Sequence, residues 1–250
     1  MVTLWFSGAP VVDKNAWIFA RGGSRRVPGK NIAEVGGRPL IAWAVAHALN
    51  ADIFDEVFVS TDSPEIAEIA EAHGARSPFL RPPELSAGDS NEMDAWRHAL
   101  NWEIKAYGRA PEVFVSVPTT APLREPSDIV ECVDALHSSQ ADIVLTVTPA
   151  THLPRYNMVS MDHTRRLRLL DRSPVLEGAG LADSIFNVTT VCYAARAQYV
   201  LRSRNLFSGR IAGLVIPQER ALDIDTPFDL KVADLLLSDR RERERGRKDG

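Results

Sequence analysis

Short apolar runs alternate with segments of helical periodicity along this chain, and the alternation limits the possible folds more than any other feature. Six runs have the composition of buried strands: 17–20, 57–61, 113–117, 143–147, 186–193 and 211–216. Helical patterns lie between them, at 39–49, 63–74, 93–104, 127–136 and 226–237. This order favours an α/β fold with a mainly parallel sheet, flanked on both faces by helices that make right-handed crossovers.

Two helix starts and one interruption are also predicted. Ser63, followed by Pro64, and Ser127 are the expected N-caps of two of the helices. The regular pattern stops at Pro149, and residues 150–185 are rich in Pro, Arg, Asp and Gly with weak periodicity. We interpret this segment as an excursion from the sheet, either a hairpin or a dimerisation arm.

Residues 16–237 are predicted to form one domain, with a flexible leader at 1–15 and a charged tail at 238–250 that is solvated or frayed. The formal net charge of −4 disfavours a nucleic-acid partner and fits a small anion held in a local basic pocket. No apolar stretch has the length of a membrane span. Cys132 and Cys192 show no metal-ligand spacing. We therefore expect a cytoplasmic protein that binds neither nucleic acid nor membrane.

A basic, glycine-rich segment follows the first predicted strand. Residues 20–31, called the phosphate loop below, read Ala-Arg-Gly-Gly-Ser-Arg-Arg-Val-Pro-Gly-Lys-Asn. Glycines let backbone N–H groups turn toward a phosphate, and Arg and Lys neutralise its charge. In open α/β sheets, ligands bind beyond the carboxyl ends of the strands, where this loop is expected. A surface turn whose cations face water is the alternative, but the density of cations favours a nucleotide site.

The phosphate loop resembles the signature of the cytidylyltransferases that activate sialic acids and related nonulosonic acids with CTP. Four further segments match that family in the same order: 59–63, 81–85, 120–124 and 223–230. The resemblance implies a Rossmann-like fold of the nucleotide-diphospho-sugar transferase type. It also implies transfer of CMP from CTP to an acid with release of pyrophosphate, in a homodimer whose site the excursion at 150–185 completes.

The resemblance also implies roles for individual residues. Arg21 and Lys30 would hold the CTP phosphates, Asn31 would contact the nucleotide, and Arg81 would lie near the cytosine. The full set expected to bind the nucleotide is Ala20, Arg21, Gly22, Gly23, Ser24, Arg25, Lys30, Asn31 and Arg81. Arg26 is expected to face solvent.

Two aspartates separated by one residue form the expected metal site. In an extended segment the side chains of Asp223 and Asp225 leave the same face, so both carboxylates can address one ion. The same pattern also occurs in structural turns. With the phosphate loop and the resemblance, Mg²⁺ binding is favoured, and Arg21, Lys30, Asp223 and Asp225 are the expected catalytic set. Asp229 is interpreted as a first-turn helix charge.

The acceptor side departs from the family pattern. Pro118 stands where a glutamine commonly touches the sugar, and the usual Asn-Gly-Ala-Ile-Tyr segment is changed between Asn187 and Tyr193. The acceptor is therefore open between a nonulosonic acid, Kdo and a small phosphonate. The candidate acceptor contacts are Thr120, Arg155, Arg172, Asn187, Thr189 and Thr190. His98 and His152 are candidate general bases, and a non-catalytic nucleotide-binding module is the alternative function.

Overall fold

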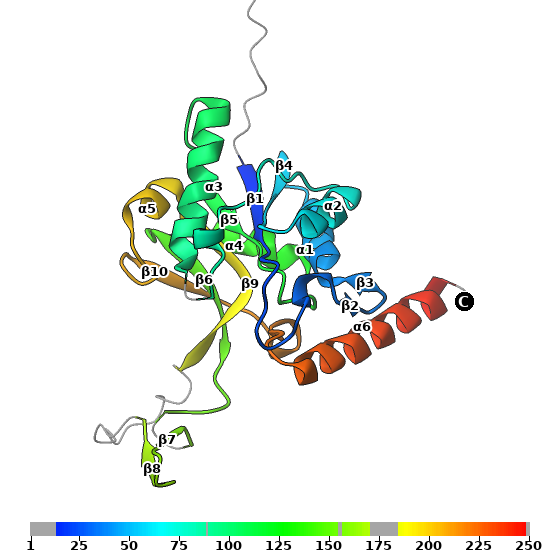
Figure 1. Ribbon diagram of the computed structural model, residues 1–250, viewed down its shortest axis with the longest axis vertical. Helices are drawn as coiled ribbons and strands as arrows, with labels where there is room; N and C mark the ends of the chain where they lie inside the picture. The colour runs from blue at the N-terminus through cyan, green and yellow to red at the C-terminus, as the bar shows by residue number, and fades with distance from the viewer. Residues whose placement is uncertain (1–13, 89, 155–156, 171–184, 249–250) are drawn as a thin grey trace, which may run out of the picture.

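The computed structural model describes residues 14–88, 90–154, 157–170 and 185–248. Its centre is a six-stranded sheet with the order β10-β6-β9-β5-β1-β4 (Figure 1). The strands are β1 Lys14–Phe19, β4 Glu56–Ser60, β5 Val113–Ser116, β6 Ile143–Pro149, β9 Phe186–Arg196 and β10 Ile211–Val215. β1 pairs in parallel with β4 and β5, and β10 with β6, whereas β9 runs antiparallel between β5 and β6. The predicted mainly parallel α/β sheet is confirmed.

Helices cover both faces of the sheet. They are α1 Leu40–Asn50, α2 Pro64–Ala72, α3 Glu92–Tyr107, α4 Pro126–Ser138, α5 Ala197–Arg202 and α6 Pro227–Lys248. Successive strand residues point to opposite faces, so Ala16 and Ile18 pack toward α1, α2 and α4, while Trp17 packs toward α3 and α5. This double covering explains why the strands are almost continuously apolar.

Short elements connect this frame. The 3₁₀ helices are η1 Lys30–Ile32, η2 Pro83–Leu85 and η4 Gln218–Arg220, and the small hairpin strands are β2 Glu34–Val35 and β3 Arg38–Pro39. Within the described part of the chain, no helix has the length and apolar composition needed to cross a membrane.

Of the two predicted N-caps, Ser63 is confirmed and Ser127 is wrong. The Ser63 hydroxyl accepts a hydrogen bond from the Ile66 N–H, as predicted for the N-cap of α2. Ser127 does not cap α4, because the helix begins at Pro126 with Glu125 as its N-cap. Proline fixes a helical φ and has no N–H to lose at the first position, while the Asp128 carboxylate accepts the Glu125 N–H at 2.8 Å.

Both predicted termini need correction. β1 begins at Lys14, so the last two residues of the expected leader at 1–15 belong to the sheet, and residues 1–13 lie outside the described part. The expected tail at 238–250 is not frayed over most of its length, because α6 continues to Lys248. Its Arg and Glu residues are strong helix formers, and Arg243 forms an i,i+4 ion pair of 2.7 Å with Asp239.

The excursion leaves the sheet where β6 ends and returns where β9 begins. Between them, β7 Val159–Met161 and β8 Leu167–Leu169 form a small antiparallel hairpin away from the main body (Figure 1). The hairpin reading of the excursion is therefore confirmed for this part. Arg155 and Arg172, two predicted acceptor contacts, lie outside the described residues.

Candidate active site

The phosphate loop leaves the carboxyl end of β1 and crosses the end of β4. The Ala20 N–H donates to the Ser60 carbonyl at 3.1 Å, and the Gly22 N–H donates to Oδ1 of Asp62 at 2.8 Å. Gly22 lies so close to the next segment that a Cβ there would be 3.2 Å from Cβ of Ser63. The loop is thus held against β4, and the Gly22 N–H is occupied by Asp62 rather than free.

Asn31 joins this loop to the end of β5. Its side chain is 6% exposed, its amide donates to the Arg21 carbonyl at 2.9 Å, and its Oδ1 accepts the Thr119 hydroxyl at 2.6 Å. Gly29, with φ of 65°, adopts the left-handed conformation that turns the chain into η1. Asn31 therefore fixes the loop, and its own polar atoms are already paired.

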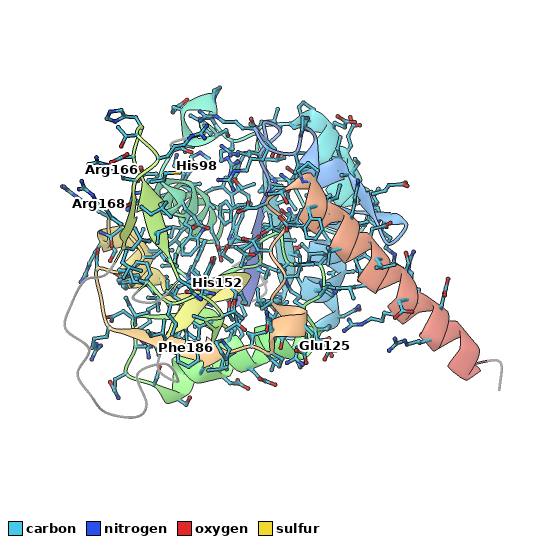
Figure 2. The ribbon with its side chains drawn as sticks, turned by 90° about the horizontal axis from the view of Figure 1, so that it is seen from below. His98, Glu125, His152, Arg166, Arg168 and Phe186 are labelled. Carbon is cyan, nitrogen blue, oxygen red and sulfur yellow. The ribbon has the colours of Figure 1, made fainter. Side chains whose placement is uncertain are left out.

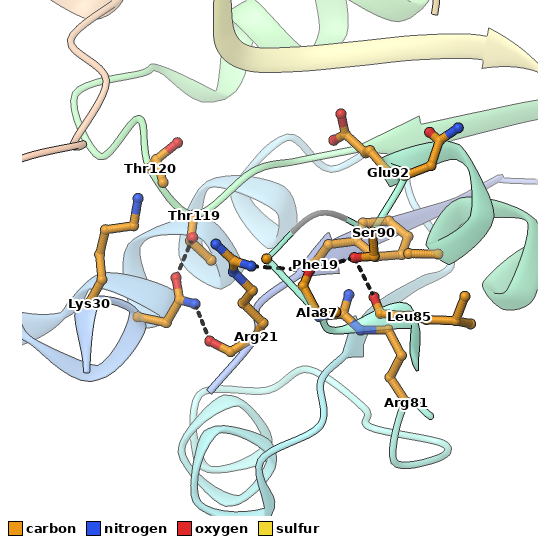
Figure 3. A pocket seen from close by; sticks show the side chains of 14 residues that line it. Phe19, Arg21, Lys30, Arg81, Leu85, Ala87, Ser90, Glu92, Thr119 and Thr120 are labelled. Carbon is orange, nitrogen blue, oxygen red and sulfur yellow. Dashed lines mark hydrogen bonds between the residues drawn. The ribbon is translucent and has the colours of Figure 1, made fainter. Parts of the chain in front are cut away.

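A cleft of about 320 Å³ opens beside the loop. In the view of Figure 3, Arg21 lies between Lys30 and Arg81, and Glu92 lies on another wall of the cleft. The described lining residues are Phe19, Arg21, Lys30, Asn31, Arg81, Leu85, Ala87, Gly88, Ser90, Asn91, Glu92, Ala95, Thr119 and Thr120. Three cations and a single carboxylate in this set make the cleft suited to a polyanion.

The cations are held by the surrounding backbone and side chains. Arg21 donates to the Ala87 carbonyl at 3.2 Å, and Nε of Arg81 donates to the Ser86 hydroxyl at 2.9 Å. Arg81 is 6% exposed, and burial lowers the pKa of its guanidinium, with the nearby Asp62 carboxylate opposing the shift. Such preorganised cations lose little freedom when an anion binds.

Arg25 reaches across to the opposite lip of the cleft. A Cβ on Gly88 would lie 2.7 Å from a terminal nitrogen of Arg25, so the guanidinium rests against the Gly88 backbone. Gly23 is exposed with open space around it, and Ser24 is half-buried. Of the residues expected to bind the nucleotide, Arg21, Lys30, Asn31 and Arg81 line the cleft, whereas Ala20, Gly22, Gly23, Ser24 and Arg25 are not among its lining residues.

The phosphate loop meets the segment that contains the two aspartates. Nζ of Lys30 donates to the Ile224 carbonyl at 2.7 Å and lies 3.6 Å from Oδ1 of Asp225. Arg26, expected to face solvent, is exposed but also pairs with Oδ2 of Asp225 at 3.2 Å. The tertiary structure thus brings Lys30 and the aspartate segment together, as the sequence predicted.

A chain of hydroxyls connects the cleft to Asp223. The Thr120 hydroxyl donates to Oγ1 of Thr190 at 2.9 Å, and the Thr190 hydroxyl donates to Oδ1 of Asp223 at 3.0 Å. Thr189 differs, because it is 4% exposed and its hydroxyl donates to Thr146 on β6 at 2.8 Å. Neighbouring strand residues face opposite ways. Thr120 therefore lines the cleft and is linked through Thr190 to Asp223, whereas Thr189 is turned toward β6 and does not line the cleft.

Asn187 also lies apart from the cleft lining, on the exposed part of β9 that pairs with the end of β6. The two candidate general bases, His98 and His152, also lie apart from the cleft lining. The His98 ring packs edge-on against Phe79 with 4.7 Å between ring centroids, and His152 contacts Thr151 at the start of the excursion (Figure 2). Neither histidine lines the cleft.

A fully buried arginine, Arg124, connects two strand segments next to the site. Arg124 donates to the carbonyls of Pro118 and Thr190, which tie the end of β5 to β9. Burial lowers its pKa to about 10, so it remains a cation at neutral pH. Pro118, which replaces the family's sugar-contacting glutamine, thus contributes its carbonyl to this support.

Sequence reasoning missed Thr119 and Glu92. Thr119 is signalled only by its position just beyond the carboxyl end of β5, and Glu92 only by its place in the first turn of α3. Burial of the Glu92 carboxyl raises its pKa to about 7. It is the only carboxylate among the described lining residues.

The aspartate segment fits a divalent cation of the Mg²⁺ type. Asp223 and Asp225 offer hard oxygen ligands beside the cationic loop, and Mg²⁺ binds through one or two carboxylates together with substrate phosphates. Among the residues that the structure describes, no group of three or more His, Cys, Asp or Glu side chains gathers as a metal cage. The protein donors alone are therefore too few, and the fit depends on phosphate oxygens as well.

Comparisons with known proteins identify similar sequences. Residues 16–173 match the cytidylyltransferase family. The chain is 30% identical over 226 residues to CMP-N,N'-diacetyllegionaminic acid synthase of Legionella pneumophila, covering 89% of this chain and 95% of the relative. It is 27% identical over 217 residues to pseudaminic acid cytidylyltransferase of Campylobacter jejuni, covering 87% and 93%.

The fold is also that of known structures. CMP:2-keto-3-deoxy-manno-octonic acid synthetase, solved with CTP, superposes with a TM-score of 0.68 at 17% identity, covering 91% of this chain and 99% of that one. At this level of identity the likeness establishes the fold alone, and the expected nucleotide-diphospho-sugar transferase-like architecture is confirmed.

Proposed function

The chain belongs to the cytidylyltransferase family, and on that premise we propose that this nucleotidyltransferase moves CMP from CTP to a nonulosonic acid and releases pyrophosphate. The contact of Lys30 with Ile224 and Asp225 is the observation that carries the proposal. It joins the cations of the phosphate loop to the segment that holds the two aspartates. Triphosphate binding needs that combination.

The chain's own residues supply position and charge. Arg21 and Lys30 would neutralise the triphosphate while the acceptor hydroxyl attacks the α-phosphorus in line and pyrophosphate departs. Asn31 keeps the loop in register with the end of β5, so the cations are placed before substrate binds. Arg81 lies at the part of the cleft that Leu85 and Ala87 line, where the cytosine ring of CTP would bind.

Asp223 and Asp225 would hold Mg²⁺ together with phosphate oxygens. The bound ion would supply further charge neutralisation at the phosphates. In the free protein the ammonium of Lys30 and the guanidinium of Arg26 balance the charge of Asp225. We therefore expect CTP and Mg²⁺ to bind together more tightly than either alone.

A nonulosonic acid is favoured as acceptor because the relatives from Legionella pneumophila and Campylobacter jejuni, covered almost end to end, are named for such acids. Kdo and small phosphonates are the other candidate acids. The hydroxyls of Thr120 and Thr190 are hydrogen-bonded in series to Asp223, an expected metal ligand, and would bind polar groups of the acceptor.

Pyrophosphate release with CTP and a panel of acids tests the proposal. The panel contains sialic, legionaminic and pseudaminic acids, Kdo and a phosphonate, with and without Mg²⁺. We expect turnover with a nonulosonic acid, loss of turnover in EDTA and recovery on adding Mg²⁺. Preference for UTP or GTP over CTP, or turnover unaffected by EDTA, would contradict it. Silence with every acid would favour the non-catalytic module.

We also propose a homodimer formed through the excursion. The hairpin exposes large apolar side chains to solvent: Met158, Val159, Met161, Leu167, Leu169 and Leu170. Exposed apolar clusters of this kind usually mark an interface. Sedimentation of the wild type should give a dimer, and Met161→Lys with Leu167→Lys should give a monomer. A wild-type monomer at micromolar concentration would overturn this part of the proposal.

The proposed location is the cytoplasm. Cys132 and Cys192 are both free and buried, as expected for a chain kept in a reducing compartment. Fractionation of cells that express the tagged chain tests this, and recovery in a secreted or membrane fraction would contradict it.

A further inference from the structure

We propose that Glu92 is the general base that takes the proton from the acceptor hydroxyl, an inference that rests on the proposed cytidylyl transfer. Its carboxylate lines the same cleft as Arg21, Lys30, Thr119 and Thr120. The cations of that wall would hold the triphosphate. An ionised carboxylate in this cleft would repel the triphosphate. Its presence is explained if it accepts a proton from the acceptor hydroxyl during the reaction.

The backbone holds Glu92 in a defined place. It is the first residue of α3, and Asn91 caps the helix by accepting the Met93 N–H at 3.0 Å. The Asn91 amide also donates to the Arg204 carbonyl at 2.6 Å, which ties this corner to the segment after α5. A positioned carboxylate can act on a substrate proton, whereas one on a mobile loop acts poorly.

The charges that face Glu92 come from three directions. Arg21, Lys30 and Arg81 line the cleft with it, Tyr193 approaches from β9, and on its own helix Asp94 is paired with Arg97. Residue 92 is exposed as a whole but lines the cleft, and partial burial of its carboxyl raises its pKa to about 7. A base with a pKa near the working pH is effective in both accepting and later releasing a proton.

The other candidate bases are occupied or distant. Asp225 pairs with Lys30 and Arg26, and Asp223 accepts the Thr190 hydroxyl. His98 and His152 do not line the cleft. Among the described residues that line the cleft, Glu92 is therefore the one carboxylate, and its pKa is raised.

The step balances without a further reactant. The acceptor oxygen forms a bond to the α-phosphorus, and the bond from that phosphorus to the oxygen bridging to the β-phosphate breaks. The electron pair of the broken bond leaves with pyrophosphate. The acceptor's proton moves to a carboxylate oxygen of Glu92, which returns it to water after product release.

The test compares Glu92→Gln with wild type and with Asp94→Asn, a matched control in the same turn whose carboxylate pairs with Arg97. Product formation is measured as kcat and KM between pH 5.5 and 9. We expect Glu92→Gln to lose about 100-fold in kcat with KM for CTP changed less than threefold. The acidic limb near pH 7 should vanish in this variant and persist in Asp94→Asn.

A Glu92→Gln enzyme that keeps its kcat within threefold, or keeps the acidic limb, overturns the inference. A change in acceptor KM alone also overturns it, because that result assigns Glu92 to acceptor binding. Wild-type turnover in the same assay tests the proposed function separately. An NMR titration of the protein with labelled glutamate measures the pKa of Glu92 without any need for turnover. A Glu92 pKa near 4 would refute the inference.

Discussion

Nζ of Lys30 lies 3.6 Å from Oδ1 of Asp225 and donates to the neighbouring Ile224 carbonyl at 2.7 Å. The two residues come from opposite ends of the folded domain, one from the turn after the first strand and one from just before the last helix. Their contact joins the phosphate loop to the segment that holds the two expected metal ligands.

Lys30→Ala is expected to lower kcat/KM for CTP by at least about 100-fold, because the triphosphate loses a preorganised cation in the transition state. The side chain of Lys30 is only 16% exposed, so water replaces its ammonium poorly. Initial-rate kinetics with CTP measure the effect.

Arg26→Ala is the matched control, since Arg26 pairs with the same Asp225 but its side chain is 70% exposed. Its kcat/KM should fall less than about threefold, as exposed ion pairs contribute little. Equal losses in the two variants would show that pairing with Asp225, and not contact with the nucleotide, explains the Lys30 effect.

Asn31→Ala should destabilise the fold by about 1–3 kcal/mol, because the Thr119 hydroxyl and the Arg21 carbonyl lose their buried partner. Urea denaturation followed by circular dichroism gives the free energy of unfolding. Asn101→Ala, at an exposed position of α3, is the control and should change it by less than about 0.5 kcal/mol. Equal stability of the two variants would argue against the bridge.

Arg220→Ala should cost about 3 kcal/mol, because it leaves the fully buried Asp128 carboxylate without its cation. The exposed pair of Arg243 with Asp239 provides the comparison, and Arg243→Ala should cost less than about 1 kcal/mol. Thermal and urea unfolding of both variants decide the point. A loss in Arg220→Ala no larger than in Arg243→Ala would contradict the prediction.

His47 predicts an acid-sensitive fold. Burial lowers its pKa from 6.5 to about 3, and Arg124, Arg240 and Arg38 add to the shift. Below pH 6.5 the unfolded chain takes up a proton that the folded chain refuses, so stability falls as pH falls from 6.5 toward 3. At pH 5.5 the loss from this residue is about 1.4 kcal/mol.

The measurement is the free energy of unfolding at pH 7.5 and 5.5 for wild type and His47→Gln. The wild type should lose about 1.4 kcal/mol more than the variant over this interval. His163→Gln, at an exposed hairpin position, should behave as wild type. Glu103 is also buried and has a raised pKa of opposite effect, but it is common to all three proteins and cancels. An identical pH response in His47→Gln and wild type would refute the assignment.

Local patterns along the chain placed strands such as β1, β4 and β5 accurately because they are mostly buried on both faces and therefore apolar. β10 and the start of β9 are more exposed, and there the β-branched and apolar composition alone indicated a strand. The start of α2 after its N-cap Ser63 could also be predicted, since a capping hydroxyl accepts a hydrogen bond from the first turn of the same helix. The start of α4 was not, because Pro126 and the paired Glu125 and Asp128 outweighed the serine at position 127. The length of α6 was underestimated because a charged run was interpreted as a tail, although such residues also favour helix.

The site was predicted unevenly for a related reason. Lys30 and the aspartate segment were assigned to one site from their residue types, and the fold brings them together. Thr189 and Thr190 could not be told apart, because only the register of β9 against β6 decides which of two adjacent threonines faces the sheet interior, and the structure turns Thr189 inward. Glu92 and Thr119 belong to no sequence motif. Their positions at the start of a helix and just after a strand are too common to indicate a functional residue without the structure.

Residues close together in the chain suffice to predict the alternating α/β frame, the basic loop after the first strand and the family that this loop resembles. Which side chains line the cleft together depends instead on how distant segments pack. Contacts such as Asn31 with Thr119, or Thr190 with Asp223, join segments whose separation and facing depend on how six strands pair, and pairing is a property of the whole sheet.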